Sequence, residues 1–390
     1  MKLRGREITV LGGGVAGLSS ALALARRGAR VRVLEQAPAI AEVGAGLQIG
    51  PNGARVLQAL GLGEALARAG IRAAGVALID GLSGRPVLRM GLVRRGWEPG
   101  QFMLHRADLI AILERGARAA GVEIVTGARA VSVVPGAPVR IDLDSGWSTE
   151  TGVLIGADGL RSVLRPLLNP ELIPRFTGKV AWRAVIPQGA AAEPVAQVFM
   201  APGRHLVSYP VRGGTKRNIA AFEERAEWAA EGWHERGRVE DFRKAFAMLR
   251  GDVPEWLAAV EEVHLWGLFR HPVAPRWQGG SCALIGDAAH PTLPFMAQGA
   301  NMALEDAWVL ARCLDEISDM DQALAAYQAA RYGRVARIVA TADANARIYH
   351  MGGVVRPVAQ AVMRLGGALF PAIPLRRFDW IYRHDVTVGG

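Results

Sequence analysis

Hydrophobic positions in the first 160 residues and again after residue 280 form short apolar runs that alternate with longer segments of helical spacing. We predict buried strands at residues 8–11, 29–34, 153–155 and 282–285, because these runs have strand length and are followed by glycine or an acid. Apolar residues at helical spacing predict helices at 18–27, at 105–120 and from 302 onward. Strands that alternate with helices predict an α/β, Rossmann-like fold with a parallel sheet.

A different pattern occupies residues 179–267, where apolar and polar positions alternate. It predicts strands at 180–186, 195–200, 205–211 and 217–222, then helices at 239–250 and 253–260. Residues 74–104 also have strand character, and we expect them to join this second domain. The chain then divides into a nucleotide-binding domain in three parts (1–75, 101–178 and 268–345), an inserted mixed β-sheet substrate domain (76–100 and 179–267), and a C-terminal helical tail (346–390).

The tail is apolar from Met351 to Leu375 but is interrupted by Arg356 and Arg364, so it is not a transmembrane span. Three interpretations stay open for it: an amphipathic helix packed on the body, a dimer contact, or contact with a membrane surface. We expect no stable insertion into a membrane, and a monomer or homodimer.

Composition sets further bounds. A chain of 390 residues with 51% hydrophobic residues and 47 glycines is globular and fits two domains. Two cysteines cannot form a disulfide framework, which indicates a reducing compartment. Lys2, Arg4 and Arg6 before an apolar stretch imitate a signal peptide, but the glycine spacing inside that stretch favours a nucleotide loop and a cytoplasmic protein. The net charge of +10 is spread without a basic block, so we expect no nucleic-acid partner.

The first strand runs into a G-x-G-x-x-G loop formed by Gly12, Gly14 and Gly17, and the second strand ends at Glu35, 18 residues after the last glycine. Gly12 permits the tight turn, Gly14 lets the backbone approach a pyrophosphate, and Gly17 lets helix and strand pack closely. Glu35 would accept a hydrogen bond from a ribose hydroxyl. This unit predicts binding of NAD or FAD in preference to NADP.

Two further strands end at an acid, Asp158 and Asp287. After Asp287, a loop at residues 291–299 leads into a helix whose first backbone N–H groups would stabilise an anion. An ordinary strand–loop–helix corner explains this stretch equally well. Around Asp158, a hairpin turn is the alternative, although Ser162 and Arg165 continue as a helix and favour a strand-to-helix corner.

Glycine also recurs between residues 42 and 52, which suggests backbone lying against a flat ligand, with a plain surface loop as the alternative. Arg106 lies in the first turn of its helix, where a cation opposes the helix dipole, so an anionic partner explains it better than helix stability. Arg183, on the strand that begins at Val180, would ordinarily be a solvated residue. His205 would ordinarily be a structural histidine.

Three motifs, Gly12 to Gly17 with Glu35, Gly156-Ala157-Asp158-Gly159, and Gly286-Asp287-Ala288-Ala289-His290-Pro291, together resemble the fingerprints of single-component FAD-dependent aromatic hydroxylases. Details of the chain are similar to the salicylate hydroxylase and hydroxybenzoate 6-hydroxylase branch. The resemblance implies FAD, with NADH or NADPH as a transient co-substrate that has no Rossmann domain of its own. The expected cofactor-binding residues are Gly12, Gly14, Ala16, Gly17, Glu35, Gly46, Leu47, Gln48, Arg106, Asp158, Asp287, Gly299, Ala300 and Asn301, and we predict no metal.

The family's chemistry consists of flavin reduction by NAD(P)H, addition of O2 to give a C4a-hydroperoxide, and transfer of OH to an aromatic ring. In the hydroxybenzoate 6-hydroxylase branch a strand of the form His-Leu-Val-x-Tyr-Pro carries a substrate-contacting His and Tyr, and residues 205–210 fit it. The two side chains lie about 13 Å apart along a strand, so they would reach a small ring from opposite ends. The expected catalytic residues are His205, Tyr209, Arg183 and Pro294. Pro294 departs from the family, since that branch carries Gln there, so its substrate and regiochemistry do not transfer.

The leading interpretation is an aromatic hydroxylase that acts on a small phenolic acid with O2. One alternative is a flavin oxidoreductase or monooxygenase of the same fold that acts on a larger quinone precursor or natural-product ring. Another is a non-catalytic FAD-binding or regulatory protein, against which the intact Asp287 and Gly299 regions argue.

Overall fold

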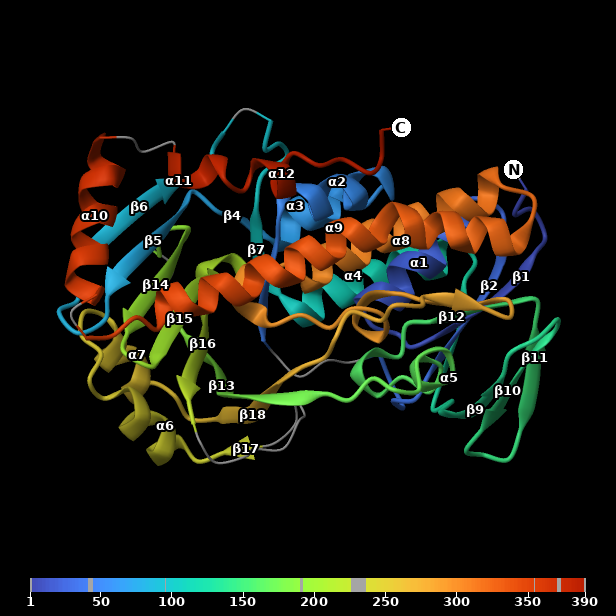
Figure 1. Cartoon of the computed structure of the whole chain (residues 1–390), viewed down its shortest axis with the longest axis horizontal. Coiled ribbons are helices and arrows are strands. Elements are labelled where there is room, and N and C mark those ends of the chain that lie inside the picture. Colours follow the sequence, from blue (N-terminus) through green and yellow to red (C-terminus); the bar gives the residue numbers. More distant parts are fainter. Residues whose placement is uncertain are drawn as a thin grey trace.

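The computed structural model describes residues 2–40, 45–94, 96–189, 192–225, 236–353, 355–369 and 373–388. Its two larger sheets lie toward opposite ends of the long axis of the molecule (Figure 1). Part of the glycine-rich stretch, residues 42–44, lies outside the described residues.

A six-stranded sheet carries the nucleotide-loop motif, in the order β19-β20-β12-β1-β2-β8. All neighbours are parallel except β19 and β20. Parallel strands buried on both faces require continuous apolar sequence, and β12 and β20 are buried throughout. The strands are β1 (Glu7–Leu11), β2 (Arg30–Glu35), β8 (Glu123–Thr126), β12 (Val153–Gly156), β19 (Gln278–Gly279) and β20 (Cys282–Leu284).

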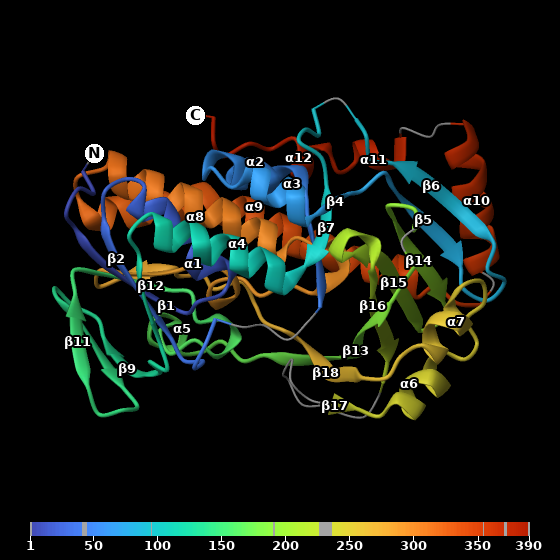
Figure 2. The ribbon, with the colours of Figure 1, turned by 180° about the vertical axis from the view of Figure 1, so that it is seen from behind.

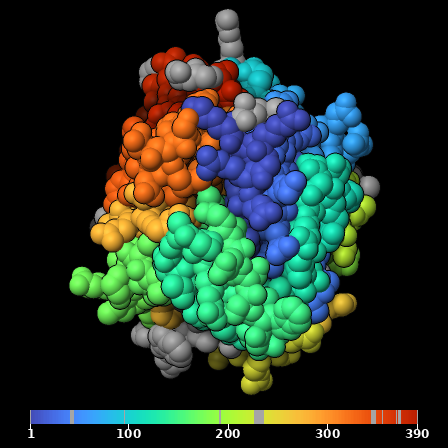
Figure 3. All heavy atoms as spheres, turned by 90° about the vertical axis from the view of Figure 1, so that its right-hand side faces the viewer, coloured from blue at the N-terminus to red at the C-terminus, as the bar shows by residue number. Residues whose placement is uncertain are grey.

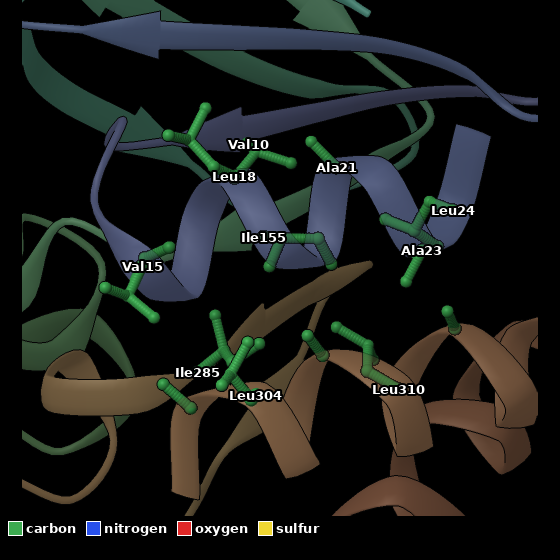
Figure 4. Packing of buried hydrophobic residues seen from close by; sticks show 14 of the residues in the cluster. Val10, Val15, Leu18, Ala21, Ala23, Leu24, Ile155, Ile285, Leu304 and Leu310 are labelled. Atoms are coloured by element: carbon green, nitrogen blue, oxygen red, sulfur yellow. The ribbon is translucent and has the colours of Figure 1, made fainter. Parts of the chain in front are cut away.

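Helix α1 (Val15–Ala25) is apolar nearly all round because it is enclosed between this sheet, α4 (Arg106–Ala119) and α8 (Gly299–Glu316). Figure 4 shows one side of α1 near Val10 of β1 and the other side near Leu304 and Leu310 of α8. These three residues are fully buried, and each such side chain stabilises the fold by roughly 1.5–3 kcal/mol. The first motif and the helix after the third motif are therefore held in one core.

Two three-stranded sheets flank the parallel sheet. The first, β9 (Ala130–Val134), β10 (Val139–Leu143) and β11 (Ser148–Thr151), is antiparallel and lies beyond the six-stranded sheet (Figure 2). In the space-filling view of that end, these green strands lie beside the blue N-terminal segment and the orange helical segment (Figure 3). The second comprises β3 (Gly46–Ile49), β7 (Phe102–His105) and β4 (Ile71–Arg72).

The eight-stranded sheet has the order β17-β18-β13-β16-β15-β14-β5-β6, and only β14 and β5 pair in parallel. Helices α6 (Val239–Phe246) and α7 (Val253–Ala258) cover one face, where Leu206 and Ile219 pack with Phe242 and Phe246. The strands are β5 (Gly75–Asp80), β6 (Pro86–Gly91), β13 (Arg175–Pro187), β14 (Val195–Ala201), β15 (Arg204–Val211), β16 (Lys216–Glu224), β17 (Arg236–Gly237) and β18 (Val263–Arg270).

Helix α9 (Met320–Tyr349) packs on α8 and crosses the molecule to the eight-stranded sheet (Figure 1). Helix α10 (Val355–Leu369) packs on β6 and exposes aliphatic side chains along its outer side. No helix in the described ranges combines the length and apolar character needed to cross a bilayer. The remaining helices are α2 (Pro51–Ala59), α3 (Gly63–Ala69), α5 (Arg165–Leu168), α11 (Ile373–Arg376) and α12 (Asp379–Tyr382), with 3-10 turns η1 (Gly159–Arg161), η2 (Arg212–Gly214), η3 (Gly286–Ala288) and η4 (Pro294–Met296).

The α/β fold class is confirmed, and the strands expected between residues 180 and 222 are present. The segment after Asp158 forms a strand-to-helix corner, since η1 and α5 follow a strand parallel to β1. Helix α2 begins at Pro51, because proline is well suited to the first helical position. The domain boundaries stay a prediction.

Candidate active site

The loop between β1 and α1 has the backbone geometry that its glycines predict. A Cβ atom at Gly17 would lie 1.8 Å from the carbonyl oxygen of Gly12, so only glycine permits this helix–strand approach. Gly12 has φ +101°, and a Cβ there would lie 2.5 Å from the carbonyl oxygen of Ala157. A Cβ at Gly14 would meet no atom within 4 Å. The backbone of Gly14 therefore faces open space, as binding of a pyrophosphate requires.

Two acidic side chains, Glu35 and Asp158, lie beside this loop. Glu35 accepts hydrogen bonds from the backbone N–H groups of Gly13, at 2.5 Å, and Ala37, at 2.7 Å. Asp158 follows Ala157, the residue in contact with Gly12, and its Oδ2 accepts from Val163 N–H at 2.8 Å. Its Oδ1 is buried without a hydrogen bond, and burial raises the pKa of this carboxyl. A buried acceptor without a donor is expected to receive one from a bound molecule or from water.

The third motif contacts the first at the same edge of the parallel sheet. Gly286 has φ +60°, and a Cβ there would lie 2.7 Å from the Cβ of Ala16. Asp287 is exposed in η3, directly after this contact. The three motifs, separated by up to about 270 residues, are thus brought to one corner of the parallel sheet.

Helix α8 begins beside the same corner, with Gly299 and Ala300 half-buried in its first turn and without a side-chain cap. Asn301 is fully buried, and its Oδ1 accepts from Gly50 N–H at 2.8 Å. Its Nδ2 donates to the carbonyl oxygens of Ala297, at 2.8 Å, and Gln48, at 3.2 Å. Asn301 therefore fixes the helix N-terminus, and its free N–H groups, against β3.

Behind this N-terminus lies an ion network that sequence patterns did not reveal. Arg331 of α9 is 1% exposed, with Nη1 2.7 Å from Glu305 Oε2, and its Nε donates to Asp306 Oδ1 at 2.7 Å. Burial opposes ionisation of Glu305, yet the charge of Arg331 and hydrogen bonds from Arg334 lower its pKa to about 2. His290 of the third motif lies 2.5 Å from Asp306 Oδ2 through Nε2. This network joins the motif loop, α8 and α9 into one rigid unit.

Arg106 is the first residue of α4, half-buried, after the N-cap His105, whose Nδ1 accepts from Ala107 N–H at 3.3 Å. His105 pairs with Gly46 across β7 and β3. Arg106 thus lies at the end of the small sheet that carries Gly46, Leu47 and Gln48. Its positive charge there would attract an anionic ligand.

The predicted substrate residues share one face of the eight-stranded sheet, opposite α6 and α7. His205 and Tyr209 alternate along β15 with Val207 between them, and Val207 pairs with Ala220, which in turn pairs with Arg183. Residues directly opposite in a sheet project from the same face. The sheet register therefore brings Arg183, His205 and Tyr209 to a common surface.

Two elements of the nucleotide-binding side pack on this face. A Cβ at Gly46 would lie 2.6 Å from Cγ of Asn218 and 2.8 Å from Cε2 of Tyr209, and Gly46 N–H donates to Asn218 Oδ1 at 2.7 Å. Tyr209 also hydrogen-bonds the Gln48 side chain, and burial raises its pKa to about 12. Tyr209 is thus a neutral hydroxyl at the junction of β3 and the sheet.

The second element is the loop that precedes α8. Pro294 is half-buried at the start of η4, and the next residue, Phe295, lies 5.2 Å from Phe222 and 5.6 Å from His205, between ring centroids. Leu293 and Phe295 join Ala220, Phe222 and Trp266 in one apolar cluster. This loop therefore packs on the sheet face and connects the third motif to α8.

The C-terminal segment also contributes a side chain, Tyr382, to the surroundings of the site. Tyr382 of α12 would lie 3.0 Å, at Cε1, from a Cβ on Gly50, and it hydrogen-bonds Gln298. Burial raises the pKa of Tyr382 to about 12. Asn218, Phe295 and Tyr382 lack a local sequence signature, because each acquires its place through contacts distant in the chain.

Comparisons with known proteins agree with this geometry. A family model described as an FAD binding domain matches residues 6–342. The chain belongs to this family. As a member of the FAD-dependent aromatic hydroxylases it is a flavoprotein monooxygenase, which confirms the predicted family and enzyme class. The chain is 36% identical over 399 residues to 3-hydroxybenzoate 6-hydroxylase of Polaromonas naphthalenivorans (strain CJ2), covering 97% of this chain and 96% of the relative.

This flavoprotein monooxygenase is also 35% identical over 353 residues to 3-amino-4-hydroxybenzoate 2-monooxygenase of Streptomyces cremeus, covering 88% of each chain. Its fold matches the crystal structure of Klebsiella pneumoniae HpxO complexed with FAD and uric acid, with a TM-score of 0.83, 25% identity and coverage of 94% and 95%. The open face of Gly14 and the unpaired Asp158 Oδ1 fit the FAD that the family binds. The individual cofactor and catalytic residues stay predictions.

Proposed function

We propose that this flavoprotein monooxygenase hydroxylates a small phenolic acid, with NAD(P)H as reductant and O2 as oxidant. The proposal rests on one observation. A neutral histidine, a neutral tyrosine and an arginine share a sheet face on which the apolar loop between the third motif and α8 packs. Relatives named for hydroxybenzoate and aminohydroxybenzoate substrates, at 33–36% identity, support the substrate class.

His205 is suited to accept the phenol proton. Its ring is 1% exposed and stacks on Phe222 at 4.6 Å, and burial holds its pKa well below 6.5, so it is neutral at pH 7. A phenolate ring is a better nucleophile than a phenol, so removal of this proton prepares the ring for attack.

Tyr209 and Arg183 are suited to hold the substrate. With its pKa raised to about 12, Tyr209 keeps its proton and donates a hydrogen bond. Arg183, half-buried and 5.4 Å from the Trp266 ring, provides positive charge for a carboxylate. We infer that the substrate ring lies between these groups and Pro294. Because Pro294 has neither an N–H group nor a polar side chain, it cannot offer the hydrogen bond that the Gln of the related branch would offer.

FAD would be held by the loop at Gly12 to Gly17, by Glu35, Asp158 and Asp287, and by the N-terminus of α8. When bound, the flavin supplies an electrophilic oxygen derived from O2 after its reduction by NAD(P)H. The N-terminal N–H groups of α8, fixed by Asn301, would stabilise negative charge on the reduced ring. The apolar cluster around Phe295 excludes water from the sheet face.

A substrate panel tests this function. The FAD-loaded protein is incubated with 3-hydroxybenzoate, 2-hydroxybenzoate, 3-amino-4-hydroxybenzoate and, as a non-phenolic ring, uric acid. NADH and NADPH oxidation, peroxide and products are measured. We expect one hydroxybenzoate to stimulate NAD(P)H oxidation and give a hydroxylated product. Stimulation by uric acid alone, or peroxide without product from every phenol, would overturn the proposal.

The roles of the sheet-face residues are tested separately. We expect His205→Phe to retain FAD but lose most of the hydroxylation rate, and Tyr209→Phe to raise KM more than it lowers kcat. Ser208→Ala, on the opposite face of the same strand, is the matched control. Equal kinetics for His205→Phe and Ser208→Ala would remove His205 from the mechanism.

A further inference from the structure

His205 belongs to a hydrogen-bonded chain that leads out of the protein interior. Its Nδ1 lies 2.7 Å from Nε2 of His350, and Nδ1 of His350 lies 2.9 Å from Oε1 of Glu224. The side chain of Glu224 is 50% exposed, whereas that of His350 is only 3% exposed. Three side chains from β15, the end of α9 and β16 thus connect the buried sheet face to solvent.

The acceptor at the outer end sets the direction of every hydrogen bond in this chain. An ionised carboxylate only accepts, so His350 must donate from Nδ1 to Glu224. Neutral His350 then has an unprotonated Nε2, which accepts from the Nδ1–H of His205. The remaining Nε2 of His205 carries a lone pair, and it has no hydrogen-bond partner within the described part of the chain.

The surroundings keep both imidazoles neutral at rest. His205 contacts the rings of Phe222, Phe295 and Tyr349, and burial lowers its pKa. Burial also lowers the pKa of His350, against the raising effect of Glu224. The other charged groups that face the pair are Lys179, whose Nζ is 3.5 Å from Glu224 Oε1, and Arg204, and both disfavour a lasting imidazolium.

The hydrogen-bonded series His205–His350–Glu224 is held in place by backbone contacts. His350 follows the last residue of α9, and its carbonyl oxygen accepts from Gly203 N–H at 3.2 Å in the turn between β14 and β15. Gly203 in turn accepts at its carbonyl from Glu224 N–H at 2.8 Å. Gly203 thus fixes His350 and Glu224 relative to each other.

We propose that His350 and Glu224 form a proton relay that carries the substrate proton from His205 to solvent. This inference rests on the proposed function, in which His205 accepts that proton. The phenol O–H bond breaks as an N–H bond forms at His205 Nε2. The Nδ1 proton of His205 passes to His350 Nε2, and the Nδ1 proton of His350 passes to Glu224, which releases it to water. Charge is conserved, since the phenolate left behind balances the proton released.

The same chain returns a proton when the product phenolate is protonated, which restores both original tautomers. His350 and Glu224 therefore act through His205 and are positioning and relay residues. A purely structural role would leave the pH dependence of hydroxylation unchanged, and this difference makes the relay testable.

Three variants of the FAD-loaded enzyme test the relay, with 3-hydroxybenzoate as the probe. His350→Gln keeps hydrogen-bonding groups but cannot transfer a proton, and Glu224→Gln removes the outer carboxylate from an exposed position. Glu262→Gln is the control for loss of charge, because Glu262 is also an exposed carboxylate with a cationic partner, Arg236. We expect His350→Gln to lower kcat by about 100-fold, the lower end of the range for acid–base catalysis, with FAD content unchanged.

The pH profile and chemical rescue provide the decisive readouts. The rate of His350→Gln should rise with pH as the phenol ionises in solution. Added imidazole should restore activity to a fourth variant, His350→Ala, in which the ring is removed. Glu224→Gln should show a smaller loss, and Glu262→Gln none. A wild-type pH profile in His350→Gln, or a loss in Glu262→Gln equal to that in Glu224→Gln, would overturn the relay.

A measurement without substrate separates failure of the relay from failure of the proposed function. Nitrogen NMR of histidine-labelled resting protein, assigned with the His205→Phe and His350→Gln variants, reports the tautomer of each ring. Neutral Nδ1–H tautomers for both support the relay even if no phenol is hydroxylated. An Nε2–H tautomer at His350 would overturn it even if the enzyme hydroxylates 3-hydroxybenzoate.

Discussion

Replacement of Arg331 by methionine tests whether the buried ion network holds the cofactor corner together. Arg331 bridges Glu305 and Asp306, both fully buried, and reaches them from α9. The substitution keeps an unbranched aliphatic stem but leaves two carboxylates next to each other with one cation fewer. Glu305 keeps Arg334, at 2.7 Å, and Asp306 keeps His290.

The magnitude follows from the cost of an uncompensated buried charge. Removing one partner of a buried ion pair destabilises a protein by about 3–5 kcal/mol. The entropy of unfolding is roughly 2.1 cal/mol/K per residue, so a 390-residue chain that unfolds as one unit loses about 4–6 °C in Tm. We expect weaker FAD retention as well, because His290 and the start of α8 are held by the same carboxylates.

Thermal and urea unfolding of the apoprotein, with FAD content after gel filtration, measure these effects. Arg68→Met is the matched control, because Arg68 pairs with Glu64 at the surface, where both side chains are largely exposed and an ion pair is worth at most about 1 kcal/mol. The double variant Arg331→Met/Glu305→Gln should recover part of the loss, since it removes one of the two adjacent negative charges that Arg331 bridges. A Tm for Arg331→Met equal to that of Arg68→Met would refute the reasoning.

Two further predictions concern the loop and the sheet-face histidine. Gly14→Ala should leave the Tm of the apoprotein unchanged but abolish FAD retention. Gly17→Ala places a Cβ 1.8 Å from the carbonyl oxygen of Gly12 and should lower the yield of folded protein. Equal FAD retention by Gly14→Ala and wild type would contradict the role of Gly14. Because the pKa of His205 is well below 6.5, the unfolded chain binds a proton that the folded chain does not. Stability should therefore fall as pH drops below about 6.5, and His205→Phe should flatten this slope in urea unfolding series; an unchanged slope would count against a neutral buried His205.

The parts that the sequence predicts well are those whose physics is local. The G-x-G-x-x-G loop, the acids at Glu35 and Asp158 and the helix at α4 depend on residues within one turn or one strand. Their backbone requirements, such as the close approach at Gly17, restrict the residue type directly. The three motifs meet because Gly12, Asp158 and Asp287 follow three adjacent parallel strands, β1, β12 and β20.

The parts that could not be predicted depend on contacts between distant residues. Asn218 meets Gly46 across 172 positions and His350 meets His205 across 145, and neither Asn218 nor His350 carries a local sequence pattern. Arg331 lies within an ordinary helical sequence, and only the crossing of α9 over α8 places it between two carboxylates. Single residues that complete a buried polar network are therefore visible only in three dimensions.

The origin of the oxygen atom in the product tests the central claim most directly. The FAD-loaded enzyme is supplied with NADH or NADPH, 3-hydroxybenzoate or the best phenol of the panel, and ¹⁸O-labelled O2, and the product is analysed by mass spectrometry. We predict one labelled hydroxyl group per product molecule, formed in proportion to the NAD(P)H consumed. Unlabelled product, or NAD(P)H oxidation that yields only peroxide with every phenol, would contradict the assignment of this chain as a phenolic acid hydroxylase.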